Sequence, residues 1–478
     1  MIRSTFVPCL FTLLSGCAHV APECATHAGT PWLELSSQHF VVRTNLPADE
    51  ARGAAVQFER AHASVFAAFP NGGSSSLEPL EVVVFTNTAQ LQDLSGDPLL
   101  DAALTYDWRG PLLLTANTTA LIESTQLRLT LHEMAHHASA GALRRWPRWF
   151  EEGLAVYLET ITIDPQKQTA VRGAAHQLKL GEVMRWGVLP VASLWAWDVE
   201  PDPLNGLEQH RTASAWFWVH FLFNEQRSAV DRFMRSLAEG EEPRTAWQAV
   251  FGKSSPAEMA QAAEAYIVKG QTRAQVMELS QLNTAFTERV ISDAQVHALL
   301  ARVAGATGAW SRARVEARVA MTLGGGDLMA LEQNVVTQET AEGRVDAARA
   351  LTQQTPRHAA GWLLLGLALP PTDPERGQAL ALAVELEPKS FFALSELAKF
   401  RCAEARCQEG VVLAEKAASL APGDARVQAA TAAVQHQAGL CALAAVSQQR
   451  ALEVLPRRAS TRLRAQLQSQ LAEYQNCL

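Results

Sequence analysis

The chain has 478 residues, of which 48% are hydrophobic and 19% are charged, a balance typical of globular proteins. This length corresponds to roughly two to four domains. A net charge of −8 argues against a nucleic-acid partner, because neutralising phosphates requires a basic surface. The sequence has no run of about 18 apolar residues, which argues against a membrane-spanning helix.

The N-terminus has the pattern of an export signal. Arg3 precedes an apolar stretch that ends in Leu14-Ser15-Gly16-Cys17, and this segment resembles a bacterial lipobox. The resemblance implies removal of residues 1–16, lipidation of Cys17, and a tether over residues 17–31 that holds the protein to a membrane. Ala18 fits sorting to the outer membrane, so we expect the periplasmic face of the cell envelope. The alternative is an ordinary secretory signal with a chance cysteine.

Strand and helix patterns alternate in the first half of the chain. β-branched and apolar runs predict strands at 40–44, 80–85 and 111–115, and a loop rich in Gly and Ser separates the first two at 71–76. Helical spacing of apolar residues predicts helices at 49–69, 124–140, 147–159 and 212–224. The fold class expected for this half is therefore α+β.

One segment of this region has the spacing of a metal site. His132 and His136 lie four residues apart, so a helix places both imidazoles on one face, where they can bind one zinc ion. Glu133 lies beside them, within reach of a metal-bound water. The alternative is a pair of histidines whose hydrogen bonds are satisfied in the core.

The next predicted helix supplies a third ligand. Trp149, Glu152, Gly153 and Tyr157 follow the motif, and a catalytic zinc takes three protein ligands and one open position. The combined pattern resembles the gluzincin metallopeptidases, and most closely their exported peptidase-MA-like group. That resemblance covers residues 32–270. It implies a zincin-like domain with one zinc ion held by His132, His136 and Glu152.

The resemblance also implies a mechanism. The zinc ion lowers the pKa of its bound water, and Glu133 accepts a proton from that water and delivers it to the leaving amine. The predicted strand 111–115 is expected to lie at the edge of the sheet, above the cleft. An extended protein or peptide substrate could pair with it there.

The helix that supplies an oxyanion donor departs from the family pattern. Thr212 stands where relatives usually have Tyr, so His210, Arg211 and Tyr106 are candidates for the oxyanion donor. This departure leaves activity open.

Other polar residues near the motif have expected places. Glu159 lies on the same helix face as Glu152 and could orient a ligand histidine, although a solvent-facing Glu is equally compatible. Glu151 and His137 each point about 100° away from a neighbouring ligand. Tyr157 is expected to point into the core.

The second half of the chain is an internal repeat from about residue 293 to 478. Pro388, Pro422 and Pro456 are 34 residues apart, and so are Ala383, Ala417 and Ala451. This period resembles the tetratricopeptide repeat, which implies an all-α solenoid of four to five repeats with a concave surface for a protein partner or substrate. The alternative is a helical bundle with coincident prolines.

Five cysteines remain in the mature chain once Cys17 is lipidated. Cys407 and Cys441 occupy equivalent places in successive repeats, generally too far apart for a disulfide. Cys402 and Cys407 flank one inter-helix turn and could be joined across it. Cys24, in the tether, is the cysteine expected to stay unpaired.

Two functions are compatible with this organisation. The first is a membrane-tethered zinc peptidase that hydrolyses envelope proteins or peptides, with repeats that recruit partner or substrate. The second is a zinc-binding scaffold with weak or no catalysis, whose repeats mediate protein–protein interaction. Retention of Glu133, which does not hold the metal, favours the first function, whereas Thr212 favours the second.

Overall fold

The computed structural model describes residues 29–70, 79–116, 125–164, 166–197, 206–269, 274–279, 283–455 and 461–477. Residues 1–28, which contain the signal pattern, Cys17 and Cys24, lie outside the described residues, as does Pro456. Among the described helices, none has both the length and the apolar character needed to cross a bilayer.

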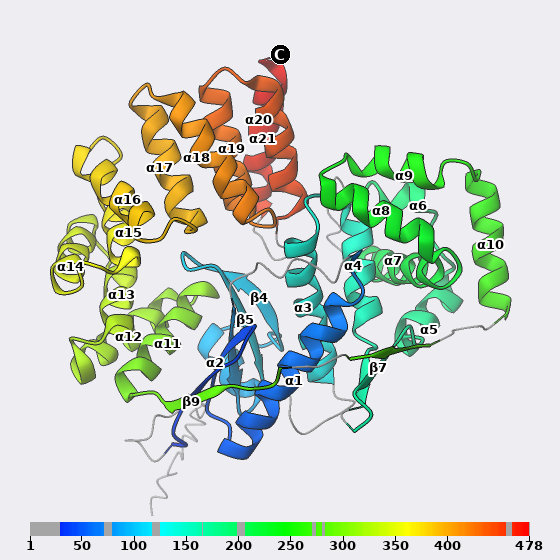
Figure 1. Ribbon diagram of the computed structural model, residues 1–478, viewed down its shortest axis with the longest axis horizontal. Helices are drawn as coiled ribbons and strands as arrows, with labels where there is room; N and C mark the ends of the chain where they lie inside the picture. Colours follow the sequence, from blue (N-terminus) through cyan, green and yellow to red (C-terminus); the bar gives the residue numbers. More distant parts are fainter. Residues whose placement is uncertain are drawn as a thin grey trace, which may run out of the picture.

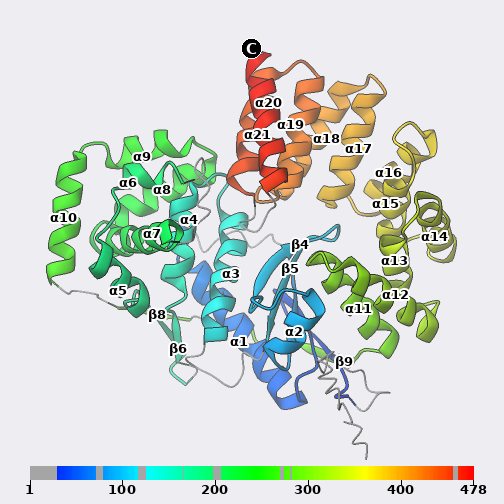
Figure 2. The same ribbon diagram turned by 180° about the vertical axis from the view of Figure 1, so that it is seen from behind.

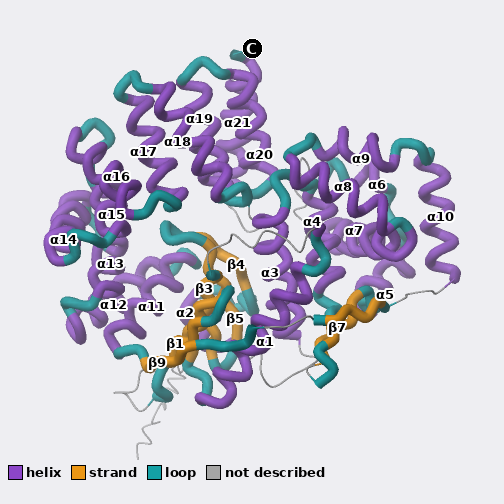
Figure 3. The backbone as a smooth tube through the Cα atoms, viewed as in Figure 1, coloured by secondary structure: helices purple, strands orange, loops and turns teal. Residues whose placement is uncertain are grey.

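A six-stranded sheet forms the centre of the first half of the chain (Figure 3). Its order is β4-β5-β3-β2-β1-β9; β2, β3 and β5 run parallel, and the outer strands pair antiparallel. The strands are β1 Leu33–Ser36, β2 Phe40–Thr44, β3 Leu80–Phe85, β4 Ala103–Tyr106, β5 Pro111–Ala116 and β9 Thr287–Val290.

Alternation along β3 explains why both faces of this sheet are covered. Val82 and Val84 belong to the larger apolar core, which includes residues of α1, α3 and α4. Val83 and Phe85 point to the opposite face, where they join a second core with α2 and α11. A strand that is apolar on both faces reads as a continuous hydrophobic run, as the sequence 80–85 does.

The prediction of which strand lies at the edge of the sheet is wrong. We expected 111–115 at the edge, but β5 lies between β4 and β3, and β4 is the edge. The chain reverses at Gly110, whose φ of 132° suits glycine, so β4 folds back onto β5 with Tyr106 opposite Pro111. Four residues of β4 are too few to reveal a strand by pattern alone.

Ten helices and a small sheet complete the first region in the described residues. The small sheet has the order β6-β7-β8. Helices α4 and α7 pack so closely that a Cβ on Gly153 would lie 2.5 Å from the Ala215 carbonyl oxygen. The elements are α1 Ala48–Phe66, α2 Thr88–Ser95, α3 Thr125–Ala142, α4 Arg148–Leu158, β6 Thr162–Asp164, β7 Thr169–Arg172, α5 Gln177–Trp186, α6 Val191–Leu194, α7 Gly206–Glu225, α8 Arg227–Glu239, α9 Pro243–Phe251, α10 Pro256–Lys269 and β8 Gln275–Glu278.

The second half consists of five helix pairs and a last helix, as the described residues show. Helices α17 and α19 start 34 residues apart, and so do α18 and α20. Ala383, Ala417 and Ala451 are all buried, which lets paired helices approach. The helices are α11 Asp293–Ala306, α12 Trp310–Gly324, α13 Leu328–Thr337, α14 Ala341–Gln354, α15 Ala359–Ala368, α16 Pro374–Leu386, α17 Phe391–Ala403, α18 Cys407–Leu420, α19 Ala425–Gln437, α20 Cys441–Glu453 and α21 Thr461–Asn476.

Two disulfides join helices of the repeat region. Cys402–Cys407 closes the turn between α17 and α18, which confirms the expected link across that turn. Cys441–Cys477 joins the start of α20 to the end of α21 and was not foreseen. Cys407 and Cys441 therefore each pair within their own part of the array.

The repeat helices curve around the first region and contact it at both ends of the array (Figure 1). At the far end, Arg145 forms an ion pair with Glu453 at 2.8 Å, and the guanidinium of Arg450 lies 4.3 Å above the ring of Trp146. Ala425, Val454 and other residues from this end are part of the larger core. The two halves are therefore joined by a shared hydrophobic interior.

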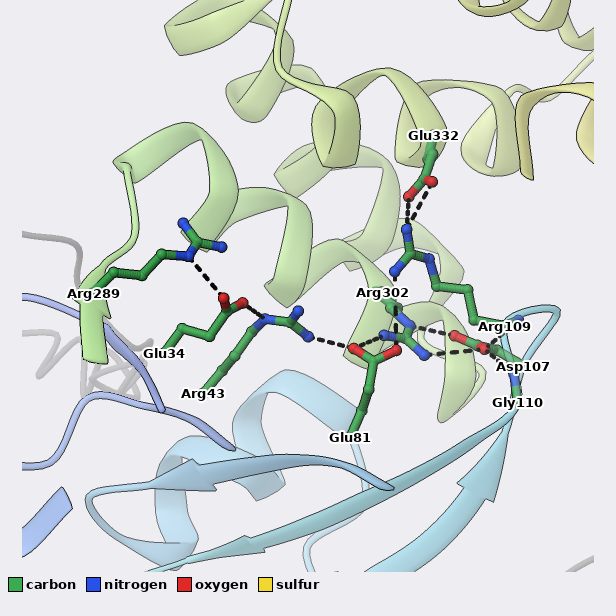
Figure 4. A network of polar contacts seen from close by, with 9 residues as sticks. All are labelled: Glu34, Arg43, Glu81, Asp107, Arg109, Gly110, Arg289, Arg302 and Glu332. Atoms are coloured by element: carbon green, nitrogen blue, oxygen red, sulfur yellow. Dashed lines mark hydrogen bonds and ion pairs between the residues drawn. The ribbon is translucent and has the colours of Figure 1, made fainter. Parts of the chain in front are cut away.

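A chain of ion pairs joins the near end of the array to the sheet (Figure 4). Arg302 of α11 is 3% exposed at its side chain and contacts both Glu81 of β3 and Asp107 of the β4–β5 turn. Burial alone would favour the neutral carboxyl, but Arg302, Arg43 and Arg109 hold the pKa of Glu81 below its usual range. Glu81 is therefore charged, and its ion pair with Arg302 holds α11 against the sheet.

Candidate metal centre

Three side chains from α3 and α4 converge on one point. His132 and His136 lie on one face of α3, with their Nε2 atoms 3.0 Å apart. The Glu152 carboxylate of α4 lies 3.9 Å from His132 Nε2. One ligand atom from each residue lies within 4.8 Å of the other two, so this group could hold a metal ion.

The other ring nitrogen of each histidine contacts a carboxylate. His132 Nδ1 lies 2.8 Å from Glu159, and His136 Nδ1 lies 2.9 Å from Glu151. An ionised carboxylate only accepts hydrogen bonds, so each Nδ1 carries the hydrogen and each Nε2 is left to bind a cation. Glu151 points away from the ligand position, as expected, and contacts the far side of His136.

The charge balance of the centre favours a cation. Burial alone would lower the pKa of His136, but Glu151, Glu152 and Glu133 raise it to about 10. Without a metal ion, a proton on His136 can form the hydrogen bond to His132 Nε2. A bound cation would replace that proton, because the same three carboxylates would stabilise its positive charge.

A further histidine, missed from the sequence, extends the network. His176 precedes α5, and its Nδ1 accepts a hydrogen bond from the Lys179 amide. Its Nε2 therefore donates to Glu159, at 3.1 Å. Burial opposes the charge on Glu159, but the two histidines lower its pKa to about 2. His176 lies outside both helices of the motif, so no spacing rule signals it.

Glu133 is held by the edge strand. Its Oε2 accepts a hydrogen bond from the Leu104 amide of β4 at 2.9 Å. Because β4 is the edge of the sheet, this amide faces away from β5, toward α3. The half-buried carboxylate of Glu133 thus has one fixed oxygen beside the paired histidines.

Of the three expected oxyanion donors, Tyr106 is electrostatically coupled to the centre. Burial chiefly raises the pKa of its phenol, and the charges of Asp424, Glu151 and Glu133 raise it further. This phenol stays protonated at neutral pH and can donate a hydrogen bond. Along the chain it lies between Leu104, whose amide contacts Glu133, and Asp107, whose carbonyl contacts Arg426 of α19.

The other two candidates have different surroundings. His210 Nε2 lies 3.0 Å from the Gly187 carbonyl, beside Trp186, and is therefore engaged at the end of α5. Arg211 is 3% exposed on α7. The Thr212 hydroxyl donates to the Glu208 carbonyl of its own helix at 2.9 Å. The threonine is thus engaged in an intrahelical bond.

Two neighbours of the motif lie where we expected them. His137 is buried, and burial lowers its pKa to about 4, so it is neutral at pH 7. Tyr157 is fully buried and packs against His220 and Phe223.

No family model matches this chain, and no curated protein matches it either. Several solved structures resemble it. A thermophilic TPR protein of Thermus thermophilus is 18% identical, with 38% of this chain and 99% of that chain covered and a TM-score of 0.33. MamA from Desulfovibrio magneticus RS-1 is 14% identical, with 36% and 99% covered and a TM-score of 0.29. Yeast Tom70 is 13% identical, with 90% and 82% covered and a TM-score of 0.32.

The helical region is tetratricopeptide-repeat-like. Its 34-residue spacing of paired helices is the period of that repeat. All three TM-scores lie below 0.5, so the function proposed next rests on the residues of this chain alone.

Proposed function

We propose that this chain is a zinc-dependent peptidase. The observation that carries the proposal is the convergence of His132, His136 and Glu152, with both histidines oriented by carboxylates at Nδ1. Two imidazoles and one carboxylate are the ligand set of a catalytic zinc with one open position, whereas structural zinc sites close with four ligands. The group has only nitrogen and oxygen ligand atoms and no sulfur, a set that is compatible with zinc.

The residues of the chain have distinct tasks in this proposal. Glu133 accepts a proton from the attacking water and returns it to the leaving amine, while the Leu104 amide keeps its carboxylate in place. Tyr106 donates a hydrogen bond to the oxyanion in place of the missing family tyrosine. Glu159 and Glu151 keep the ligand histidines oriented. A bound zinc ion would act as a Lewis acid toward the water and the peptide carbonyl.

Metal content and proteolysis of one preparation of the mature chain test this proposal. We expect about one zinc per chain and cleavage of unfolded proteins. Glu133→Gln should keep the zinc and lose at least about a hundredfold in kcat/KM. Glu182→Gln, which removes a partly exposed carboxylate that pairs with Lys179 on α5, is the matched control. Loss of cleavage in both variants would refute the assignment of Glu133.

A zinc-binding scaffold is the second candidate. The Thr212 hydroxyl is engaged within its own helix, so the family's usual donor has no replacement at that position. One zinc per chain without cleavage of a broad panel of unfolded and envelope proteins would favour this function. Failure to bind zinc after supplementation would exclude both candidates.

We further propose that the protein is anchored in the bacterial envelope through lipidated Cys17, with a protein partner or substrate bound by the repeats. The lipobox-like segment and the helical repeats support this placement. Incorporation of labelled palmitate into the full chain, and its loss in Cys17→Ala, would test the anchor. Equal labelling of both chains would refute it.

A further inference from the structure

The turn between β4 and β5 lies on the inner side of the arc formed by the repeat helices (Figures 1 and 2). Asp107 and Gly110 close this turn by backbone hydrogen bonds of 3.0 and 3.2 Å. The Asp107 carboxylate also accepts from the Arg109 amide at 2.8 Å. The turn is therefore rigid in itself, and its side chains are free to engage the repeat array.

Two arginines of the array bind the acidic end of the turn. Arg302 of α11 contacts both carboxylate oxygens of Asp107, as Figure 4 shows. Arg426 of α19 donates to the Asp107 carbonyl oxygen at 2.9 Å. The Thr105 hydroxyl, two residues earlier, donates to the Ala306 carbonyl of α11 at 3.2 Å. The turn thus connects the first and the last helix pairs of the array.

The middle of the turn is held by apolar and basic contacts. Trp108 packs against two apolar clusters whose buried residues come from α13 to α17. Arg109 donates from Nη2 to both carboxylate oxygens of Glu332, each at 2.7 Å. Glu332 is 1% exposed and also contacts His358 Nε2 at 2.7 Å, so its buried carboxylate has polar partners on two sides. The array therefore presents complementary groups to an acidic–aromatic–basic sequence.

The other end of β4 reaches the metal centre. Leu104 lies three residues before Asp107, and its amide holds the Glu133 carboxylate. Tyr106 directly precedes Asp107 and is electrostatically coupled to both Glu133 and Asp424. Residues 104–107 thus connect the contacts made by the array to Glu133, the residue proposed to transfer protons.

We propose that the repeat array positions Glu133 by holding the β4–β5 turn, and that a protein segment with an acidic–aromatic–basic sequence competes with this turn for the array. Arg302, Glu332 and Arg426 are then positioning residues, which act on the centre through β4. This inference rests on the proposed role of Glu133 in proton transfer. It assigns the inner face of the array a ligand within the chain, so partner binding and the metal centre are coupled.

Weakening the turn in the zinc-loaded mature chain tests the positioning role. We expect Arg109→Glu to raise amide hydrogen exchange at Leu104 and Thr105 about tenfold, with zinc content unchanged. It should lower kcat by about tenfold while KM changes little, because the geometry of the base is affected rather than binding. The double variant Arg109→Glu/Glu332→Arg should restore both values. Trp108→Ala should act like Arg109→Glu and provides a second variant in case one fails to fold.

The matched control is another ion pair of the array. Arg349 and Glu375 pair at 2.6 Å with both side chains exposed, so Arg349→Glu should leave exchange and kcat unchanged. Unchanged exchange at Leu104 in both folded turn variants would overturn the proposal. Hydrogen exchange does not require activity, so this result stands apart from a failure of the wild-type chain to cleave any substrate.

A peptide with the sequence of residues 105–112 tests the competition. We expect the labelled peptide to bind Trp108→Ala at least about tenfold more tightly than the wild-type chain, because the variant turn competes less well. A scrambled peptide of the same composition is the control. Equal binding of the native and scrambled peptides, or equal affinity for variant and wild type, would refute a competing partner of this chemistry.

Discussion

Glu159 joins His132 to His176 through its two carboxylate oxygens, at 2.8 and 3.1 Å. The carboxylate stands at the end of α4, seven residues after Glu152, so one helix supplies both a candidate ligand and the group that orients another candidate ligand. His176 in turn has its Nδ1 occupied by the Lys179 amide, which fixes its tautomer. Metal affinity should therefore depend on residues outside the motif.

Glu159→Gln should weaken zinc binding about 10- to 100-fold, the usual effect of removing a carboxylate behind a ligand histidine. The amide keeps the shape of the side chain but not its charge, so the structure should be retained. Competition with a chelator of known affinity measures the change, and circular dichroism checks folding. Glu182→Gln serves as a control on α5, and equal affinity in both variants would contradict the role of Glu159.

Gly153→Ala should destabilise the first region. The added Cβ would lie 2.5 Å from the Ala215 carbonyl oxygen, so α4 and α7 must move apart, at a cost of roughly 1–3 kcal/mol in the free energy of unfolding. Gly181→Ala is the matched control, since a Cβ there meets no atom within 4 Å. It should stabilise α5 by up to about 1 kcal/mol. Urea unfolding should show a lower free energy of unfolding than wild type for Gly153→Ala and a higher one for Gly181→Ala.

The free energy of unfolding should decrease as the pH is lowered below 6.5, because buried histidines are neutral in the folded chain. Burial lowers the pKa of His220 to about 4, while in the unfolded chain the pKa of this histidine keeps its ordinary value of 6.5. Between these values the unfolded state binds more protons, so each unit of acidification costs up to about 1.4 kcal/mol. Above pH 6.5 both states are neutral at this residue and the effect vanishes.

His220→Gln isolates this contribution. Gln can still contact the Gly173 carbonyl and Tyr266, two of the three hydrogen-bond partners of the imidazole, the third being the Asn224 amide. Urea unfolding with chelator present, so that metal release plays no part, should show a shallower decline between pH 6.5 and 4 than in the wild type. Parallel profiles would mean that His220 is not the titrating group.

The two disulfides should differ in their contribution to stability. Cys402–Cys407 closes a loop with a separation of 5 residues, and Cys441–Cys477 one of 36 residues. In the chain-entropy model these loops correspond to about 2 and about 4 kcal/mol. Paired Cys→Ser variants can be compared by chemical denaturation. Removal of Cys441–Cys477 should lower the free energy of unfolding more than removal of Cys402–Cys407. A larger loss at Cys402–Cys407 would contradict the loop-entropy explanation.

Much of the architecture follows from local patterns. The apolar run 80–85 forms β3, and the spacing of 34 residues forms stacked helix pairs, because strand alternation and helix pairing are short-range properties. Strand β4 was not predicted because four residues carry too little pattern, and β9 because its residues are exposed. Both depend on a neighbouring strand: β4 pairs with β5 after the reversal at Gly110, and β9 pairs with β1.

The candidate metal site likewise has a part that follows from local sequence and a part that depends on tertiary packing. That His132 and His136 share a helix face could be predicted from their spacing, because helical geometry places residues four apart on one side. The hydrogen bonds of Glu151 and His176 around them could not, since these contacts depend on how α4 and α5 pack against α3. The same holds for the contact between the repeats and the turn beside Glu133. That contact joins residues up to 319 positions apart, and no local pattern records such a distance.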